Sequence, residues 1–161
     1  MDSSLLGDYL NDHLAGSVIA MEMGAHLRDE HADDRLKSFI DVKLAEIEQD
    51  RVVLKEMIDL IGAEQSTAKK SLAWLTEKVG RVKTGGGGSE REIAFQQVEQ
   101  LETLMLGIRG KLALWELLEQ IAKRDDRLAS FDWANLKQRA KDQIAAIDEE
   151  RLTAGMRAFG G

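Results

Sequence analysis

Apolar residues recur at steps of three and four along most of the chain, a spacing that places side chains on one face of an α-helix. The pattern predicts four long helices, over about residues 4–31, 34–61, 90–123 and 132–159, and a short helix over about 66–79. The second long helix shows the stripe best, with Leu36, Ile40, Leu44, Ile47, Leu54 and Ile58 on one side. We therefore expect an all-α protein.

The first long helix departs from this pattern. Its middle, from Leu14 to Leu27, is apolar or small nearly all round, and only Ser17, Glu22 and His26 interrupt it. A helix that is apolar on every side is typically a buried one. We expect this stretch to lie inside the fold, or to bind a partner or a second copy of the chain through its surplus apolar face.

Capping residues support the predicted helix starts. Asp33 or Asp34 precedes the second long helix and Asp132 the fourth, and side chains of this type accept hydrogen bonds from the free backbone N–H groups of a first turn. Ser89 and Glu92 have the spacing of a capping box ahead of the third helix.

The connections predict how the helices are linked. Few residues separate the first two helices, so they should form an antiparallel hairpin, and Gly62 is suited to the left-handed conformation that ends a helix. The second and third helices are separated by a long connection that holds the short helix and a glycine-rich loop over 84–89. The string GGGGS in that loop is also a common engineered linker, and the sequence leaves open whether it is native. Residues 1–161 then form a single antiparallel four-helix bundle domain with one long crossover.

Composition narrows the classes of function. Proline is absent, as expected for a nearly all-helical chain, and cysteine is absent, which excludes disulfides and thiolate chemistry. The net charge is −7, whereas a nucleic-acid-binding protein needs a basic surface. No apolar run approaches the length of a membrane span and no basic leader is present, so we expect a cytoplasmic protein without a membrane segment.

Two segments of the chain match each other. Residues 44–52 and 144–152 share the form A-x-I-[ED]-x-[DE]-R, as a duplicated hairpin would leave. In helix number, crossover and duplication, the chain resembles the ferritin-like superfamily. That resemblance implies a di-metal site in which the second and fourth helices each supply Glu-x-x-His. Here the corresponding positions read Glu48-x-x-Arg51 and Asp148-x-x-Arg151, and arginine does not ligate metal.

Both arginines fall in phase with the apolar stripes of their helices. A buried cation needs a carboxylate partner, because its desolvation otherwise costs several kcal/mol. We expect Arg51 and Arg151 to form a buried ion-pair network with Glu22 and Glu102 where relatives would hold metal.

An alternative is a diverged metal-binding or oxidative enzyme. Its carboxylate-rich site for iron, manganese or zinc would use Glu22, His26, Glu46, Asp50 and Glu102. These residues also have an ordinary structural interpretation, in which they lie on helix surfaces or form ion pairs. Glu46 and Asp50 would then face Arg51 or lysines.

Other features of the third helix have ordinary structural interpretations. Lys111 and Glu116 are expected to reach solvent, and Trp115 is expected to anchor the core, as are Trp74 and Trp133 elsewhere. Gly107 and Gly110 suggest close approach of a neighbouring helix, or a small-molecule pocket beside them.

The leading prediction is a non-catalytic binding or structural protein without a functional dinuclear site.

Overall fold

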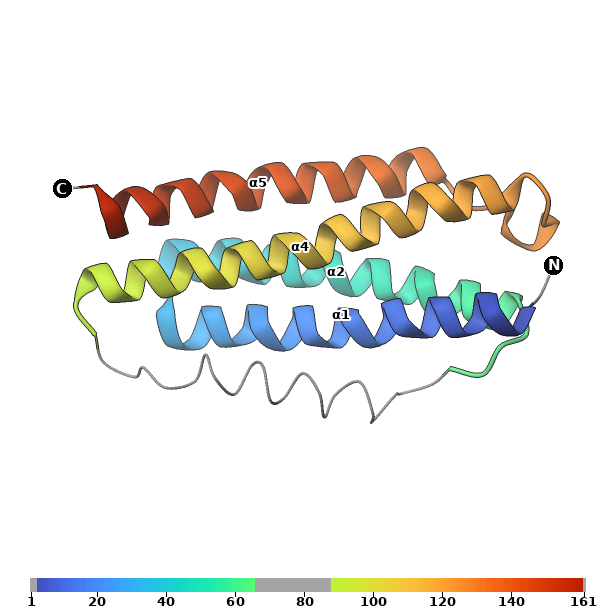
Figure 1. Cartoon of the computed structure of the whole chain (residues 1–161), viewed down its shortest axis with the longest axis horizontal. Helices are drawn as coiled ribbons and strands as arrows, with labels where there is room; N and C mark the ends of the chain where they lie inside the picture. Colours follow the sequence, from blue (N-terminus) through green and yellow to red (C-terminus); the bar gives the residue numbers. More distant parts are fainter. Residues whose placement is uncertain (1–2, 66–87, 161) are drawn as a thin grey trace.

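A computed structural model describes residues 3–65 and 88–160, and every long element in these ranges is a helix. The long helices are α1 (Ser3–His31), α2 (Asp34–Leu60), α4 (Glu90–Ala122) and α5 (Trp133–Phe159), with a short 3-10 helix, η1 (Asp126–Leu128), between the last two (Figure 1). The predicted helix over 66–79, with Trp74, lies outside the described residues, as does the glycine-rich loop up to residue 87.

The predicted caps are present. The Asp33 carboxylate accepts a hydrogen bond from the Leu36 backbone N–H at 2.8 Å, and Asp132 caps α5 in the same way. Ser89 and Glu92 form the full capping box at the start of α4. Beyond α2, Gly62 has φ +76°, the left-handed conformation expected of a residue that follows a helix.

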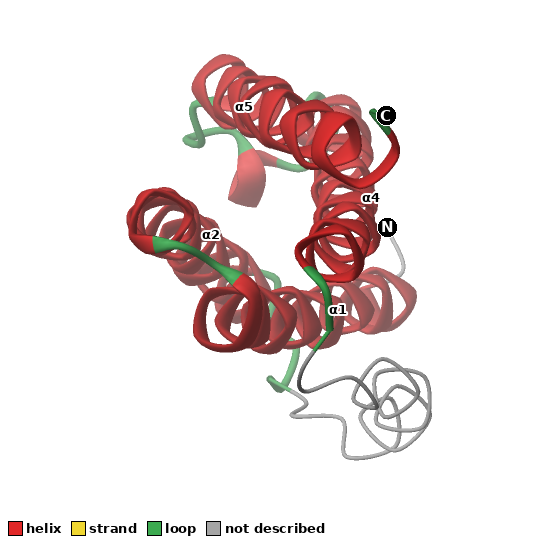
Figure 2. Cartoon of the chain, turned by 90° about the vertical axis from the view of Figure 1, so that its left-hand side faces the viewer, coloured by secondary structure: helices red, strands yellow, loops and turns green. Residues whose placement is uncertain are grey.

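The four long helices lie side by side, with α1 between α2 and α4, and α4 between α1 and α5 (Figure 2). Hydrogen bonds show which helix ends lie together. Asn11, near the start of α1, donates to the carbonyl of Glu64, just beyond α2, at 3.0 Å. Gln97, near the start of α4, donates to the carbonyl of His31 at the end of α1.

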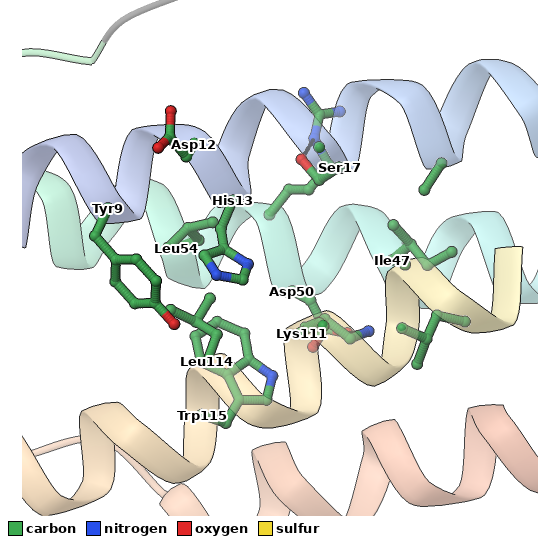
Figure 3. A pocket seen from close by; sticks show the side chains of 16 residues that line it. Tyr9, Asp12, His13, Ser17, Ile47, Asp50, Leu54, Lys111, Leu114 and Trp115 are labelled. Carbon is green, nitrogen blue, oxygen red and sulfur yellow. Dashed lines mark hydrogen bonds and ion pairs between the residues drawn. The ribbon is translucent and has the colours of Figure 1, made fainter. Parts of the chain in front are cut away.

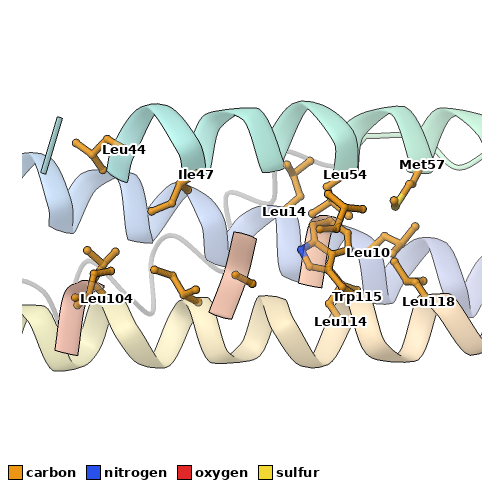
Figure 4. Packing of buried hydrophobic residues seen from close by; sticks show 14 of the residues in the cluster. Leu10, Leu14, Leu44, Ile47, Leu54, Met57, Leu104, Leu114, Trp115 and Leu118 are labelled. Carbon is orange, nitrogen blue, oxygen red and sulfur yellow. The ribbon is translucent and has the colours of Figure 1, made fainter. Parts of the chain in front are cut away.

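A continuous apolar core runs along the inside of the bundle (Figure 4). Leu10, Met57, Leu101, Trp115 and Leu118 are among its fully buried members. Truncation of a fully buried leucine in such a core costs about 2–5 kcal/mol, because transfer and cavity terms add. The sequence-based expectation of a core role is confirmed for Trp115 and Trp133.

The expectation that the middle of α1 is buried on every side is wrong. Met23 and Leu27 are buried, but Val18 and its three successors are only half-buried, and Glu22 is exposed. Within the described residues α1 packs against α2 and α4, and the exposure of Glu22 marks a side of α1 that these contacts do not cover. Among the described helices, none has the length and apolar character needed to cross a membrane.

Candidate functional site

A pocket of about 360 Å³ lies between α1, α2 and α4, and we call it the interhelical pocket. Its volume falls within the usual range for small-molecule sites, about 300–1,000 Å³. Its lining comprises Tyr9, Asp12, His13, Gly16, Ser17 and Ala20 of α1, Ile47, Asp50, Arg51 and Leu54 of α2, and Gly107, Ile108, Gly110, Lys111, Leu114 and Trp115 of α4 (Figure 3). These residues recur at three- and four-residue steps on each helix, so each helix contributes one face.

Three glycines keep this pocket open. A Cβ placed on Gly16, Gly107 or Gly110 would meet no atom of a neighbouring segment within 4 Å. The expectation that Gly107 and Gly110 admit a closely packed helix is therefore wrong, whereas the alternative of a pocket beside them agrees with the structure. Gly16, Gly107 and Asp12 are exposed, so the pocket opens to solvent between α1 and α4.

A buried ionic cluster borders the pocket. Asp50 is only 2% exposed, and its two carboxylate oxygens are divided between two cations. Oδ1 accepts from Arg139 of α5, with the Nε at 2.8 Å, and Oδ2 accepts from the Lys111 ammonium. Lys111 also donates to Oε1 of Gln143, at 2.5 Å. One carboxylate thus joins α2, α4 and α5.

Lys111 does not reach solvent, contrary to the sequence-based expectation. Its ammonium turns inward to Asp50, and the side chain is 15% exposed. Burial lowers the pKa of Lys111, because removal from water disfavours the charged form, and the neighbouring Asp50 opposes this shift. A lysine this well enclosed can present a strong hydrogen-bond donor to anything that enters the pocket.

Polar side chains of α1 and α2 also line the pocket and are held by hydrogen bonds. Arg51 donates from its Nε to the Ser17 hydroxyl at 3.0 Å, and Ser17 donates in turn to the Leu14 carbonyl at 2.5 Å. Burial also lowers the pKa of His13, which favours the neutral ring, and the nearby Asp12 opposes this shift. Trp115 closes the pocket with an indole ring that is 0% exposed.

The predicted buried network of four residues forms only in part: the contact between Arg151 and Glu102 is present, whereas Arg51 and Glu22 do not join it. Arg51 is half-buried and pairs within its own helix with Glu48, at 2.5 Å, while Glu22 is exposed on the outer side of α1. Arg151 pairs with Asp148 at 2.8 Å, and it reaches Glu102 at 3.4 Å on the bundle surface. The acid-x-x-Arg motifs are therefore intrahelical pairs, because residues three apart on a helix are neighbours.

The residues proposed for a metal site are spread over the bundle. Glu46 binds Lys43 at 2.8 Å, Glu102 lies near Arg151, and Asp50 lies in the ionic cluster. His26 contacts the ring of His31, with centroids 5.5 Å apart. Within residues 3–65 and 88–160, no three carboxylate or histidine side chains gather as a metal would require.

Sequence reasoning did not identify Arg139 and Gln143 as site residues. A signal for them exists, since Gln143 shares the stripe of Leu136, Ala140 and Ile147, and a polar residue in a core position requires a partner. Asp50 likewise falls between Ile47 and Leu54.

Comparison of the chain with known protein families, with curated proteins and with solved structures found no match.

Proposed function

We propose that this chain is a non-catalytic binding protein: a ferritin-like, antiparallel bundle that holds a small, mostly apolar molecule in the interhelical pocket. The observation that carries the proposal is the pocket itself, enclosed by three helices and lined mainly by apolar and aromatic side chains. Pockets of this size and chemistry are the usual sites for small organic ligands.

The ferritin-like layout is supported by two features. The start of α1 lies beside the end of α2, and the end of α1 lies beside the start of α4. A crossover that runs the length of the bundle between two helical hairpins would give this arrangement. The intrahelical pairs Glu48–Arg51 and Asp148–Arg151 also occupy equivalent places on α2 and α5, as a duplicated hairpin predicts.

The helical glycines strengthen the case for a binding role. Glycine inside a helix costs about 1 kcal/mol relative to alanine. Gly107 and Gly110 incur this cost on the face of α4 that lines the pocket, where neither is required for close packing. A binding role explains why glycine occupies these two positions, because the absence of a side chain leaves space for a ligand.

A pocket-filling variant tests the proposal. A panel of small organic fragments, each about the size of phenylpropane, is tested for binding. Binding is measured by ligand-observed NMR and by the shift in the thermal unfolding midpoint of the protein. We expect fragments to bind the parent protein and to lose binding in Gly110→Leu, whose side chain occupies the pocket. The matched control is Ala113→Leu, which adds the same side chain to the exposed side of α4. No binding to the parent, or equal binding to Gly110→Leu, would overturn the proposal.

A second candidate is self-association through α5. Leu152, Met156 and Phe159 recur along one side of its last turns; Met156 is 71% exposed and Phe159 is 69% exposed, with Phe95 of α4 against the Phe159 ring. Such an exposed apolar group is typical of an interaction surface. Analytical ultracentrifugation tests it: Met156→Ser together with Phe159→Ser should shift any dimer to monomer, and a monomeric parent would exclude it.

A further inference from the structure

Two side chains that line the interhelical pocket, Trp115 and Lys111, have hydrogen-bond donors without an acceptor among the described residues. The indole Nε1–H of Trp115 is buried and has no acceptor in the described part of the chain. A buried unsatisfied donor costs about 1–3 kcal/mol, and buried tryptophan N–H groups are ordinarily paired. The Lys111 ammonium has three donors. It uses one for Asp50 and one for Gln143, which leaves one donor for a further acceptor.

These two donors lie on the same side of the pocket. Figure 3 shows the nitrogen edge of the Trp115 ring turned toward Lys111, which precedes it by one turn of α4. A single group with two acceptor atoms could therefore bind both. A carboxylate has two such oxygens, and it accepts charge-assisted hydrogen bonds that are shorter and stronger than neutral ones.

The charges of the ionic cluster also favour an anion. Asp50 is one carboxylate between two cations, Lys111 and Arg139, so the cluster carries a net positive charge in a poorly solvated place. Glu46 is near enough to influence Lys111, but it pairs with Lys43 at 2.8 Å. An additional negative charge beside Lys111 would offset the cost of burying the second cation.

We propose that the interhelical pocket binds a small organic acid, whose carboxylate accepts hydrogen bonds from Trp115 and Lys111 and whose apolar part packs against Leu54, Ile108 and Leu114. The inference rests on the proposed function and adds the chemical class of the ligand. Asp12, the acidic residue at the mouth, is exposed, so water and salt screen its charge.

Three probes of similar shape separate the two proposals: 3-phenylpropionate, 3-phenylpropionamide and (3-methylbutyl)benzene, each titrated calorimetrically into the full-length protein at pH 7. We expect the acid to bind about tenfold tighter than the amide, and the hydrocarbon to bind most weakly. If the amide matches the acid, the carboxylate proposal fails while the pocket proposal stands. If none of the three binds, both fail.

Variants identify the donors. Lys111→Met should remove the preference for acid over amide, while Trp115→Phe should weaken both compounds by several-fold. Lys137→Met is the matched control, since it removes a half-buried lysine paired with Glu119 at 2.7 Å outside the pocket. A preference for the acid that survives in Lys111→Met overturns the assignment. The comparison of acid with amide in the parent protein needs no variant, so poor folding of Lys111→Met leaves the proposal testable.

Discussion

Gly110→Ala should stabilise the protein although it lies in the candidate site. A Cβ at this position meets no neighbouring segment within 4 Å, so the new methyl group creates no overlap. The helix gains about 1 kcal/mol from the lower backbone entropy of alanine in the unfolded chain. For a chain of this size, that gain corresponds to a rise of about 2–4 °C in thermal midpoint.

Gly7→Ala supplies the contrasting case within the same bundle. Its Cβ would lie 2.7 Å from the Cβ of Ala63, an atom fixed to the backbone that cannot turn aside. Overpacking of this kind costs about 1–3 kcal/mol, which equals or exceeds the gain in helix propensity. The substitution should leave the unfolding free energy unchanged or lower it by up to about 2 kcal/mol.

Urea denaturation followed by far-UV circular dichroism measures both effects, provided that the slope of unfolding free energy against urea is unchanged among the variants. The reasoning is refuted if Gly110→Ala lowers the unfolding free energy, since the space around that Cβ would then be occupied. The reasoning is also refuted if Gly7→Ala raises the unfolding free energy as much as Gly110→Ala does. The short distance to Ala63 would then cost no free energy.

Three further outcomes follow from the described contacts. Asp50→Ala should cost about 3–5 kcal/mol in urea denaturation because it leaves two partly buried cations, Lys111 and Arg139, without their carboxylate. Glu150→Ala, which removes an ion pair with the exposed Arg35, should cost less than about 1 kcal/mol, and similar costs for the two variants would contradict the buried position of Asp50. Burial lowers the pKa values of His13 and His31 in the fold, and the unfolded chain takes up these protons first, so the unfolding free energy should fall as pH drops below about 6.5; a rise with acid would reverse the assigned direction. Protein purified without chelator should contain no stoichiometric iron, manganese or zinc by elemental analysis; bound metal that is lost in Glu22→Ala would support the metal-binding alternative instead.

The long helices could be predicted from sequence because their information is local. A stripe such as that of α2, closed by Asp33 at one end and Gly62 at the other, depends only on residues within a few turns. The side of α1 that faces outward could not be predicted in this way. Its middle is apolar all round, and the burial of a given side depends on where α2 and α4 pack, although the charge of Glu22 does mark the exposed side.

The site was less predictable because it depends on distances between helices. The repeated segments lie on α2 and α5, and Arg51 and Arg151 each pair with an acid three residues earlier on the same helix. Arg151 also reaches the predicted partner Glu102, but at a longer distance of 3.4 Å. Asp50 instead recruits Arg139, from a helix far along the chain. No spacing rule within one segment connects these two residues.

The cluster around Asp50 also has a consequence for the axial alignment of the bundle. Leucine-rich faces tolerate a slide of one helix past another, since one apolar contact replaces the next. A slide of one turn, about 5.4 Å, would separate Asp50 from Lys111 or Arg139 and leave a charge without a partner in the interior. A single carboxylate can thus set the axial register of three helices at once. The apolar residues on either side of it along the bundle specify that register only weakly.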